Sequence, residues 1–365
     1  MKCLRKHSWL CLSLTMSKGV YIHIPFCVRK CLYCDFCSTG DHSLMKEYVN
    51  ALINEIKEHK GTFADTVFIG GGTPTVLGDE LIRVINAVKE AFRLEPSCEF
   101  TVEANPGTVD YNLLSKMKEA GVNRLSLGVQ SFNDNELKAL GRIHSAVEAK
   151  EAFLMARKAG FDNINIDIML STPHQTLESV KSTLEAVKEM NPEHVSAYSL
   201  IIEEGTPFYD MELDLPDEDT EREIYYYTVE YLKSMGLERY EISNFAKTGY
   251  EARHNIKYWT QEEYIGLGVA AASFENNCRY TNTCDIASYI NGKRYDEREF
   301  IDKDEQLKEK FMLGLRMSRG VKYSGEFEET IEKLIAKGLL EKKDGFVHLT
   351  EKGFDLGNVV FMEFV

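Results

Sequence analysis

The chain has 365 residues, of which 44% are hydrophobic and 28% are charged, and its formal net charge is -15. This composition is that of a globular protein and excludes a disordered chain, and the length suffices for one barrel-sized domain and a smaller one. The acidic balance argues against a nucleic-acid partner, and no apolar run reaches the roughly 18 residues of a membrane span.

The nine cysteines are an odd number, clustered at one place and scattered elsewhere. This pattern does not resemble a disulfide framework, and we expect a reducing, cytoplasmic location that keeps thiolates available for a metal centre. Residues 1–15 loosely imitate a signal peptide, but the apolar run is short and no small-residue cleavage site follows it. We interpret residues 1–15 as a dispensable extension ahead of Met16, with a secretory signal as the alternative.

Within residues 16–245, short β-rich runs alternate with amphipathic helical stretches, which predicts six parallel βα units. Six units form either an open doubly wound sheet or an incomplete barrel. The predicted strands are 20–24, 66–69, 99–103, 124–129, 163–169 and 194–200, and the predicted helices between them are 44–59, 80–92, 111–120, 146–159 and 177–190.

The first predicted strand leads into a cysteine-rich loop, in which Cys27, Cys31 and Cys34 have CxxxCxxC spacing. Three thiolates can bind three corners of a 4Fe-4S cluster and leave the fourth iron open to a small-molecule ligand. The alternative is a structural zinc site, which requires four closed ligands, usually from two CxxC-type pairs. No second pair exists, although Cys37 could in principle be a fourth ligand, so the spacing favours the cluster.

Three glycines, Gly70 to Gly72, follow the second predicted strand in the sequence GGGTP. Glycines let the backbone approach a ligand closely and expose its N–H and C=O groups. A plain tight turn is the other interpretation of this loop.

Polar residues lie at or near the ends of three later strands, namely Glu103, Gln130 and Asp167. In βα folds this edge of the sheet carries the ligands. Asn165 and Asp167 are expected to share one face of their strand, opposite three isoleucines. This pattern predicts a polar lumen that holds a ligand, and the alternative is a satisfied polar pair inside a large barrel.

Residues 246–300 are predicted to form a connecting segment with two motifs. The first is HNIKYW, from His254 to Trp259, and the second is a Gly/Ala run from Gly266 to Ser273, which suits close packing against a flat ligand or another strand. A lone histidine beside aromatic residues is more often a hydrogen-bonded histidine than a metal ligand, so both interpretations of His254 stay open.

Residues 301–365 change character, with a helix, a turn at Gly338 and a short hairpin around Asp344 and Gly345, which is the pattern of a winged helix. Such modules often bind DNA. From Asp304 to Glu363, however, this one carries twelve acidic and ten basic residues without an evident basic face. A structural or partner-docking role is therefore favoured.

Together these motifs resemble the radical S-adenosylmethionine (radical SAM) superfamily. More closely, YIHIPFC, FIGGGTPT, GVQSF, NIDIML, YEISNF, HNxxYW and GLGVAAAS resemble the oxygen-independent coproporphyrinogen III oxidase group and, within it, the HemW-type haem chaperone branch. The match covers nearly all of residues 19–365. It implies an α/β fold, an incomplete (βα)6 TIM-like barrel with a mostly helical, winged-helix-like C-terminal domain.

The resemblance also implies a site. The cluster is expected on Cys27, Cys31 and Cys34, with S-adenosylmethionine on its open iron. The positions that match the family's contacts to this cofactor are Tyr21, Tyr33, Gly71, Gly72, Thr73, Glu103, Gln130, Arg142, Asp167 and, less closely, Ala272.

One position separates the branches. In the oxidase branch a further cysteine commonly follows the third at plus two, where this chain has Phe36, while Cys37 at plus three departs from both patterns. Phe36 and HNxxYW favour the chaperone branch. That branch implies haem held near the barrel mouth, with His254 as candidate axial ligand, and its transfer to an acceptor haemoprotein.

Two rival hypotheses follow from the same residues. One is a coproporphyrinogen III oxidase, which uses a radical for the oxidative decarboxylation of porphyrinogen propionates. The other is a zinc-stabilised interaction protein without catalysis. For the radical site we expect an electron donor such as flavodoxin or ferredoxin, while a homodimer and a peripheral membrane contact stay open.

Overall fold

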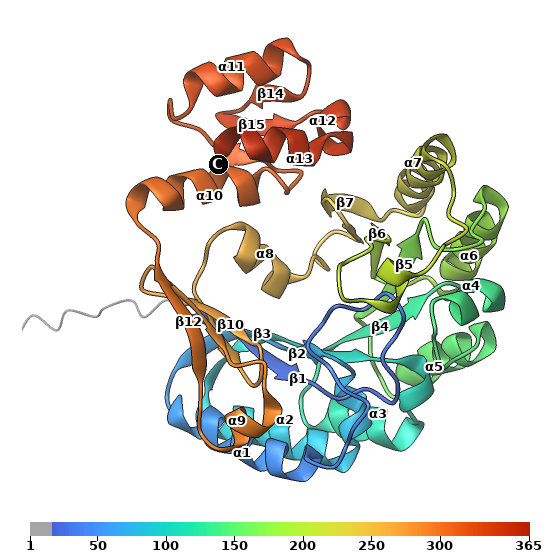
Figure 1. Cartoon of the computed structure of the whole chain (residues 1–365), viewed down its shortest axis with the longest axis vertical. Coiled ribbons are helices and arrows are strands. Elements are labelled where there is room, and N and C mark those ends of the chain that lie inside the picture. Colours follow the sequence, from blue (N-terminus) through green and yellow to red (C-terminus); the bar gives the residue numbers. More distant parts are fainter. Residues whose placement is uncertain (1–16) are drawn as a thin grey trace, which may run out of the picture.

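A computed structural model describes residues 17–365, so the prediction for residues 1–15 lies outside the described residues. Six parallel strands stand side by side in chain order in one curved sheet (Figure 1). This order lacks the reversal that marks a doubly wound sheet, and it confirms the incomplete barrel. The strands are β1 (Lys18–Ile24), β2 (Phe63–Gly71), β3 (Arg93–Ala104), β4 (Arg124–Gln130), β5 (Ile164–Leu170) and β6 (His194–Ser199).

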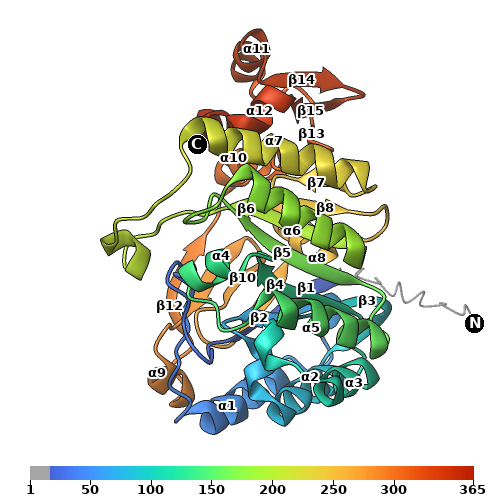
Figure 2. The same cartoon turned by 90° about the vertical axis from the view of Figure 1, so that its right-hand side faces the viewer.

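Helices follow the strands and cover the outer face of the sheet (Figure 2). Capping residues define where several of them begin; for example, the Ser145 hydroxyl accepts from the backbone N–H of Glu148, whose carboxylate accepts from the backbone N–H of Ser145. The helices are α1 (Met45–Glu58), α2 (Asp79–Ala91), α3 (Tyr111–Glu119), α4 (Asp134–Ala139), α5 (Ala146–Lys158), α6 (Leu177–Met190) and α7 (Glu218–Ser234).

Side chains alternate along each strand between the hydrophobic core under the helices and the inner face of the sheet. On β5 the three isoleucines are buried in the main hydrophobic core with helix residues such as Phe153 and Leu184. Asn165 and Asp167 therefore face the inner side of the sheet. The same alternation on β1 buries Val20, Ile22 and Ile24 in that core and turns Tyr21 and His23 inward.

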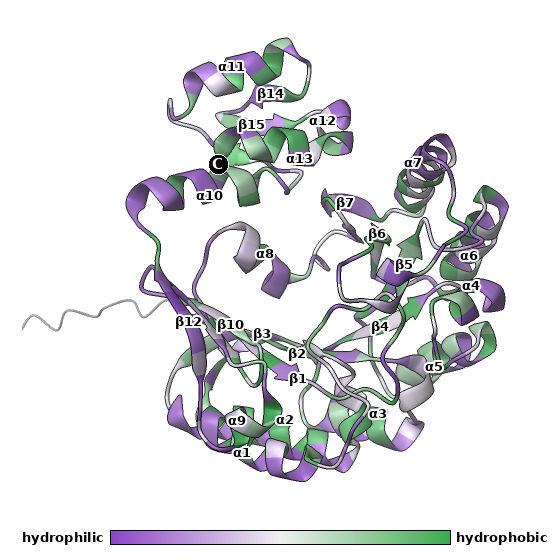
Figure 3. Ribbon diagram, in the orientation of Figure 1, coloured by the Kyte–Doolittle hydropathy of each residue, from purple (hydrophilic) through white to green (hydrophobic). Residues whose placement is uncertain are grey.

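Residues 246–300, which we expected to form a connecting segment, contribute four strands to the barrel sheet, and β7 (Glu238–Glu241) and β8 (Asn244–Ala246) bring it to twelve strands. At one edge β9 (Tyr264–Leu267) pairs parallel with β1 and is followed by β10 (Ala272–Glu275), β11 (Cys278–Asn282) and β12 (Tyr295–Phe300). The exposed, charged edge strand β12 is hydrophilic in Figure 3 and discourages pairing with another chain. At the other edge lie β7 and β8, and the segment also holds α8 (Arg253–Trp259) and α9 (Ile286–Ile290).

The Gly/Ala run packs against a strand. A Cβ on Gly266 would lie 2.0 Å from the carbonyl oxygen of Ala272, so β9 and β10 approach each other more closely than any side chain allows. Of the two interpretations of this run, the structure supports close packing of strands.

The C-terminal domain has the predicted order of helix, turn and hairpin. Gly338, Asp344 and Gly345 all have positive φ, which suits the turn and the tight hairpin. Phe311, Ile331 and Phe364 belong to a separate hydrophobic core. Its elements are α10 (Lys303–Gly314), β13 (Val321–Lys322), α11 (Glu328–Ala336), β14 (Leu340–Lys343), β15 (Phe346–Leu349), α12 (Glu351–Asp355) and α13 (Gly357–Phe361).

Among residues 17–365, helices with both the length and the apolar character needed to cross a bilayer are absent.

Candidate functional site

The cysteine loop leaves the carboxyl end of β1, at the edge where parallel βα folds carry their ligands. Cys27 is buried, whereas Cys31 and Cys34 are partly exposed. The backbone N–H of Cys27 donates to the carbonyl of Thr39 at 2.9 Å, and that of Cys34 donates to the carbonyl of Cys31 at 3.3 Å. The three thiols therefore belong to one loop that its own backbone holds in shape.

The glycine loop packs directly against the first of these thiols. A Cβ on Gly72 would lie 3.0 Å from Cys27 Sγ and 2.8 Å from the carbonyl oxygen of Phe26. The Thr73 hydroxyl donates to Cys27 Sγ at 3.6 Å. The glycine at position 72 is thus required by close approach to the cysteine loop, and the loop is more than a plain turn.

Glu103 lies beside this loop, and Asp167 lies near enough to Glu103 to repel its charge. The backbone N–H of Gly71 donates to Glu103 Oε2 at 3.2 Å, and a Cβ on Gly70 would come within 2.8 Å of that oxygen. Burial, with repulsion from Asp167 as a smaller cause, raises the pKa of Glu103 to about 8. Burial also raises the pKa of Asp167. A site that raises the pKa of two adjacent carboxyl groups is suited to a cationic or hydroxyl-bearing ligand.

Asp167 is fixed by its neighbours. Asn165 Nδ2 donates to Asp167 Oδ1 at 2.6 Å and to the Ser126 hydroxyl at 2.8 Å, while that hydroxyl donates to Asp167 Oδ2 at 3.4 Å. The polar pair is hydrogen-bonded, as the alternative interpretation expected. It also lies on the inner side of the sheet beside Glu103, so the sheet has the predicted polar inner face.

Arg142 joins the cysteine loop to the lumen. Its Nη1 donates to Cys31 Sγ at 3.4 Å, and its Nη2 donates to the carbonyl of Gly128 at the bulge of β4. Its Nε is buried without a hydrogen-bond partner among the described residues. Tyr33 packs nearby, and burial raises the pKa of its hydroxyl. A cation with an unused buried donor, next to a thiolate position, is suited to an anionic ligand group.

Gln130 ends β4 with a positive φ of 74°, a conformation rare for residues other than glycine. Its Oε1 accepts a 2.9 Å hydrogen bond from the hydroxyl of Tyr198 on β6. This strained end turns the Gln130 side chain toward the polar residues of the neighbouring strands.

His23 is a residue that sequence reasoning missed. Its Nε2 lies 2.8 Å from the carbonyl of Cys37, which can only accept, so Nε2 carries the proton. The Tyr21 hydroxyl then donates to Nδ1 at 3.0 Å. Tyr21 and His23 thereby tie the end of the cysteine loop to β1, and a Cβ on Gly71 would lie only 2.7 Å from the imidazole. The motif YIHIPFC contains this histidine, but its partner carbonyl lies fourteen residues away.

Cys37 and Ala272 lie at the edge of this arrangement. The Cys37 thiol donates to the carbonyl of Cys284 at 3.4 Å. Ala272 is on β10, where its carbonyl packs against Gly266, the residue paired with Tyr21 across β9 and β1. Strand β9 therefore separates Ala272 from Tyr21 and the other inward-facing residues of β1.

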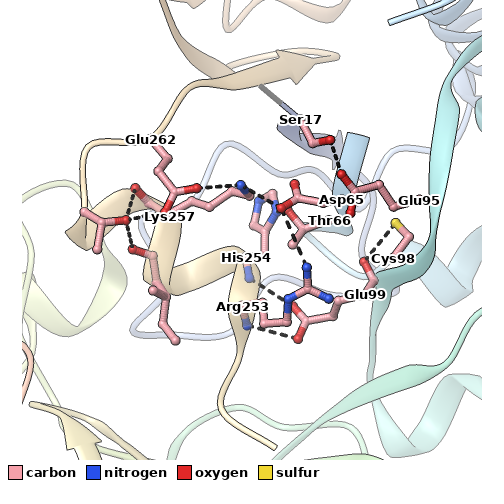
Figure 4. A network of polar contacts seen from close by, with 12 residues as sticks. Ser17, Asp65, Thr66, Glu95, Cys98, Glu99, Arg253, His254, Lys257 and Glu262 are labelled. Carbon is pink, nitrogen blue, oxygen red and sulfur yellow. Dashed lines mark hydrogen bonds and ion pairs between the residues drawn. The ribbon is translucent and has the colours of Figure 1, made fainter. Parts of the chain in front are cut away.

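His254 does not present a free nitrogen to a ligand, in contrast to its expected role as axial ligand. Its Nδ1 is hydrogen-bonded to the Thr66 hydroxyl at 2.9 Å (Figure 4). Its Nε2 is hydrogen-bonded to the Tyr258 hydroxyl at 2.8 Å. The ring stacks on Phe68 and is 1% exposed. Burial, followed by the charges of nearby cations, lowers the pKa of His254 to about 3. It is a hydrogen-bonded core histidine, as the alternative to a metal ligand predicted.

We expect His254→Ala to lower the free energy of unfolding by about 2–4 kcal/mol, because two buried hydroxyls lose a partner. Denaturant unfolding followed by circular dichroism would measure the loss. The matched control is His174→Ala, since that exposed imidazole contacts Asp214 at 3.0 Å; we expect its effect to stay within about 0.5 kcal/mol. Equal stability of the two variants would contradict the structural role.

The cysteine loop offers three thiols as possible metal ligands. Within residues 17–365, no three His, Cys, Asp or Glu side chains converge closely enough to hold one metal ion. A zinc ion draws each sulfur ligand to about 2.3 Å from a single centre, whereas the thiolates of a cluster each bind a different iron. Three thiols on one loop are able to bind three different irons of such a cluster.

Comparisons with known proteins agree with this geometry. The model of the radical SAM superfamily matches residues 21–187, and that of the HemN C-terminal domain matches residues 301–356. The heme chaperone HemW of Lactococcus lactis is 39% identical over 95% of this chain and 97% of its own, and that of Escherichia coli is 36% identical over 92% and 94%. Coproporphyrinogen III oxidase (HemN) from Escherichia coli superposes with a TM-score of 0.85 over 95% of this chain and 90% of its own; at 24% identity this likeness concerns the fold.

Proposed function

Because the chain belongs to the radical SAM superfamily and, within it, to the family of HemW heme chaperones, we propose that it binds haem and transfers it to an acceptor haemoprotein. The observation that carries the proposal is the similarity to HemW of Lactococcus lactis, which extends over more than nine-tenths of both chains. The likeness to the oxidase supports the shared barrel only.

We further propose that Cys27, Cys31 and Cys34 hold a 4Fe-4S cluster with S-adenosylmethionine on its open iron. When bound, this pair supplies radical chemistry, with an electron from a flavodoxin or ferredoxin. Of the chain's own residues, Arg142 would contact this cluster, because its Nη1 donates to the sulfur of Cys31.

The residues around the open corner match the groups of this cofactor by their chemistry. The backbone of Gly72 lies close to Cys27, at a position where a side chain would collide with the cysteine loop. Buried carboxyl groups, Glu103 and Asp167, can accept from ribose hydroxyls or an ammonium group, and the free Nε of Arg142 can donate to a carboxylate.

Phe36 distinguishes the two candidate functions. It occupies the position where the oxidase branch has a further cysteine, and its side chain is 61% exposed beside Cys37. A phenyl ring offers neither a thiol nor a proton donor. This substitution favours the chaperone over the oxidase.

The test uses the full chain, purified anaerobically and loaded with iron and sulfide. Titration with haem is expected to produce a Soret band that saturates at micromolar haem. Incubation of the same sample with reductant, S-adenosylmethionine and coproporphyrinogen III is expected to leave the porphyrinogen undecarboxylated. Absence of the Soret band would refute haem binding, and robust decarboxylation would show the oxidase instead.

A further inference from the structure

A cavity of about 520 Å³ opens between the end of α8 and the C-terminal domain. In Figure 1 these elements lie above the barrel sheet, with α8 beneath α10. The volume is within the range of roughly 300–1,000 Å³ that small-molecule and cofactor sites occupy. Its apolar lining includes Trp259, Met317, Val321 and Phe346, and none of its lining residues belongs to the cysteine loop.

His348 lines this cavity with one nitrogen available. Its Nδ1 lies 3.0 Å from the backbone carbonyl of Ser318, which can only accept, so Nδ1 carries the proton. Nε2 is then the unprotonated nitrogen, and it makes no hydrogen bond within residues 17–365. An imidazole whose Nδ1–H is held by a backbone carbonyl is in the tautomer that binds a metal through Nε2.

The backbone around His348 is built to hold this orientation. Gly320 has a φ of +67°, and a Cβ there would lie 2.1 Å from the carbonyl oxygen of Val347 and 3.0 Å from His348 Nδ1. Only glycine lets the loop of residues 318–320 come this close to β15. The imidazole is therefore positioned by the backbone, in contrast to His254, whose two nitrogens are used by side chains.

The charge of the lining favours an anionic ligand. Four cations, Lys310, Arg319, Lys322 and Lys343, border the cavity against a single carboxylate, Asp344, although the whole chain carries -15. In the described part of the chain, only Lys310 of these four forms an ion pair, at 3.6 Å with Glu326. The other three are available to carboxylates of a ligand.

Trp259 connects the cavity to the HNxxYW motif. It is the last residue of α8, and its indole Nε1 is buried without a hydrogen-bond partner among residues 17–365. The guanidinium of Arg316 lies 4.7 Å from the centre of its ring. The histidine of the motif is thus part of the core, whereas its tryptophan lines a cavity.

We propose that this cavity is the haem-binding site of the protein. The proposal rests on the proposed function, haem binding, and assigns it to this cavity. His348 Nε2 donates its lone pair to the iron, the porphyrin ring lies among Trp259 and Phe346, and the propionates face the free cations. This replaces both the barrel mouth and His254 as the place and the ligand of the haem.

The experiment compares haem titrations of the intact protein, His348→Ala and the control His174→Ala, which removes an exposed histidine outside the cavity. We expect His348→Ala to shift the Soret maximum and to weaken haem binding at least tenfold, with His174→Ala unchanged. Added imidazole should restore the spectrum of His348→Ala, an effect that a merely structural role would not produce. His348→Gln, which keeps a polar side chain, serves if the alanine variant does not fold.

A second pair tests the charges. Lys343→Glu is expected to weaken haem binding several-fold, and the exposed Lys60→Glu, which changes the net charge equally, should not. If the intact protein binds haem and the His348 variants keep its spectrum and affinity, the site is refuted and the proposed function stands. If the intact protein binds no haem, the proposed function itself fails.

Discussion

Replacing Cys31 with serine is expected to abolish cluster binding. Cys31 supplies one of the three proposed thiolates, and its sulfur accepts a hydrogen bond from Arg142 Nη1 at 3.4 Å. The anaerobically purified protein should contain about four iron and four sulfide per chain, and the variant nearly none. Cleavage of S-adenosylmethionine by the reduced protein should be lost with the cluster.

Cys37→Ser is the matched control, because Cys37 lies on the same loop but directs its thiol to the carbonyl of Cys284. Its backbone carbonyl, which accepts from His23, is unaffected by the substitution. We expect this variant to keep its iron, sulfide and visible absorbance. Loss of the cluster in Cys37→Ser and its retention in Cys31→Ser would overturn the assignment of the three ligands.

The βα units of the barrel were predictable because each carries its own pattern. Every predicted strand overlaps an observed one, and the predicted ends of helices α1, α3 and α6 fall within two residues of the observed ends. Periodicity is a local property, so short-range reasoning suffices for such elements. The edge strands β9 to β12 were not predicted. The pairing of β9 with β1 joins segments far apart in the chain, as with Gly266 opposite Tyr21, whereas β10 and β11 form a local hairpin at Asn276 and Asn277 that the sequence analysis missed.

The same limit applies to the site. The cysteines and the glycine loop were predictable from their spacing in the sequence. The carboxyl groups were predictable from their position at strand ends. The role of His254 depends on Thr66, which is 188 residues away, and on a tyrosine that any aromatic-rich segment could contain. The tautomer of His348 depends on the backbone carbonyl of Ser318. Contacts of this kind have no signature in a single sequence.

Glu103→Gln is expected to change how both stability and cofactor binding depend on pH. The pKa of Glu103 is about 8 in the folded protein, against 4.5 for an ordinary glutamate, so the folded state binds the proton more tightly. The stabilisation linked to this proton is fully present below about pH 4.5 and is lost as the pH rises through 8. Its size is on the order of 5 kcal/mol, at 1.36 kcal/mol per pKa unit.

Glutamine keeps the shape of the protonated group and never ionises, so the variant should not lose stability in this way. We therefore propose to measure denaturant unfolding of the cluster-free protein at pH 5, 7 and 9. As the pH rises, the free energy of unfolding of the variant is expected to increase relative to that of the intact protein. Glu47→Gln, at an exposed position in α1, should follow the intact protein at every pH. A constant difference between Glu103→Gln and the intact protein from pH 5 to 9 would contradict the raised pKa.

The affinity for the cofactor is expected to depend on pH in the opposite direction to the stability. The ammonium and sulfonium groups of S-adenosylmethionine favour the ionised carboxylate, so binding to the cluster-loaded protein should release a proton and strengthen as the pH rises from 6 toward 8. Glu103→Gln should bind at least tenfold more weakly at pH 8 and lose this dependence. Equal affinity of the two proteins at pH 8 would show that Glu103 has a structural role only. Asp167 would then be the acidic residue that contacts the cofactor.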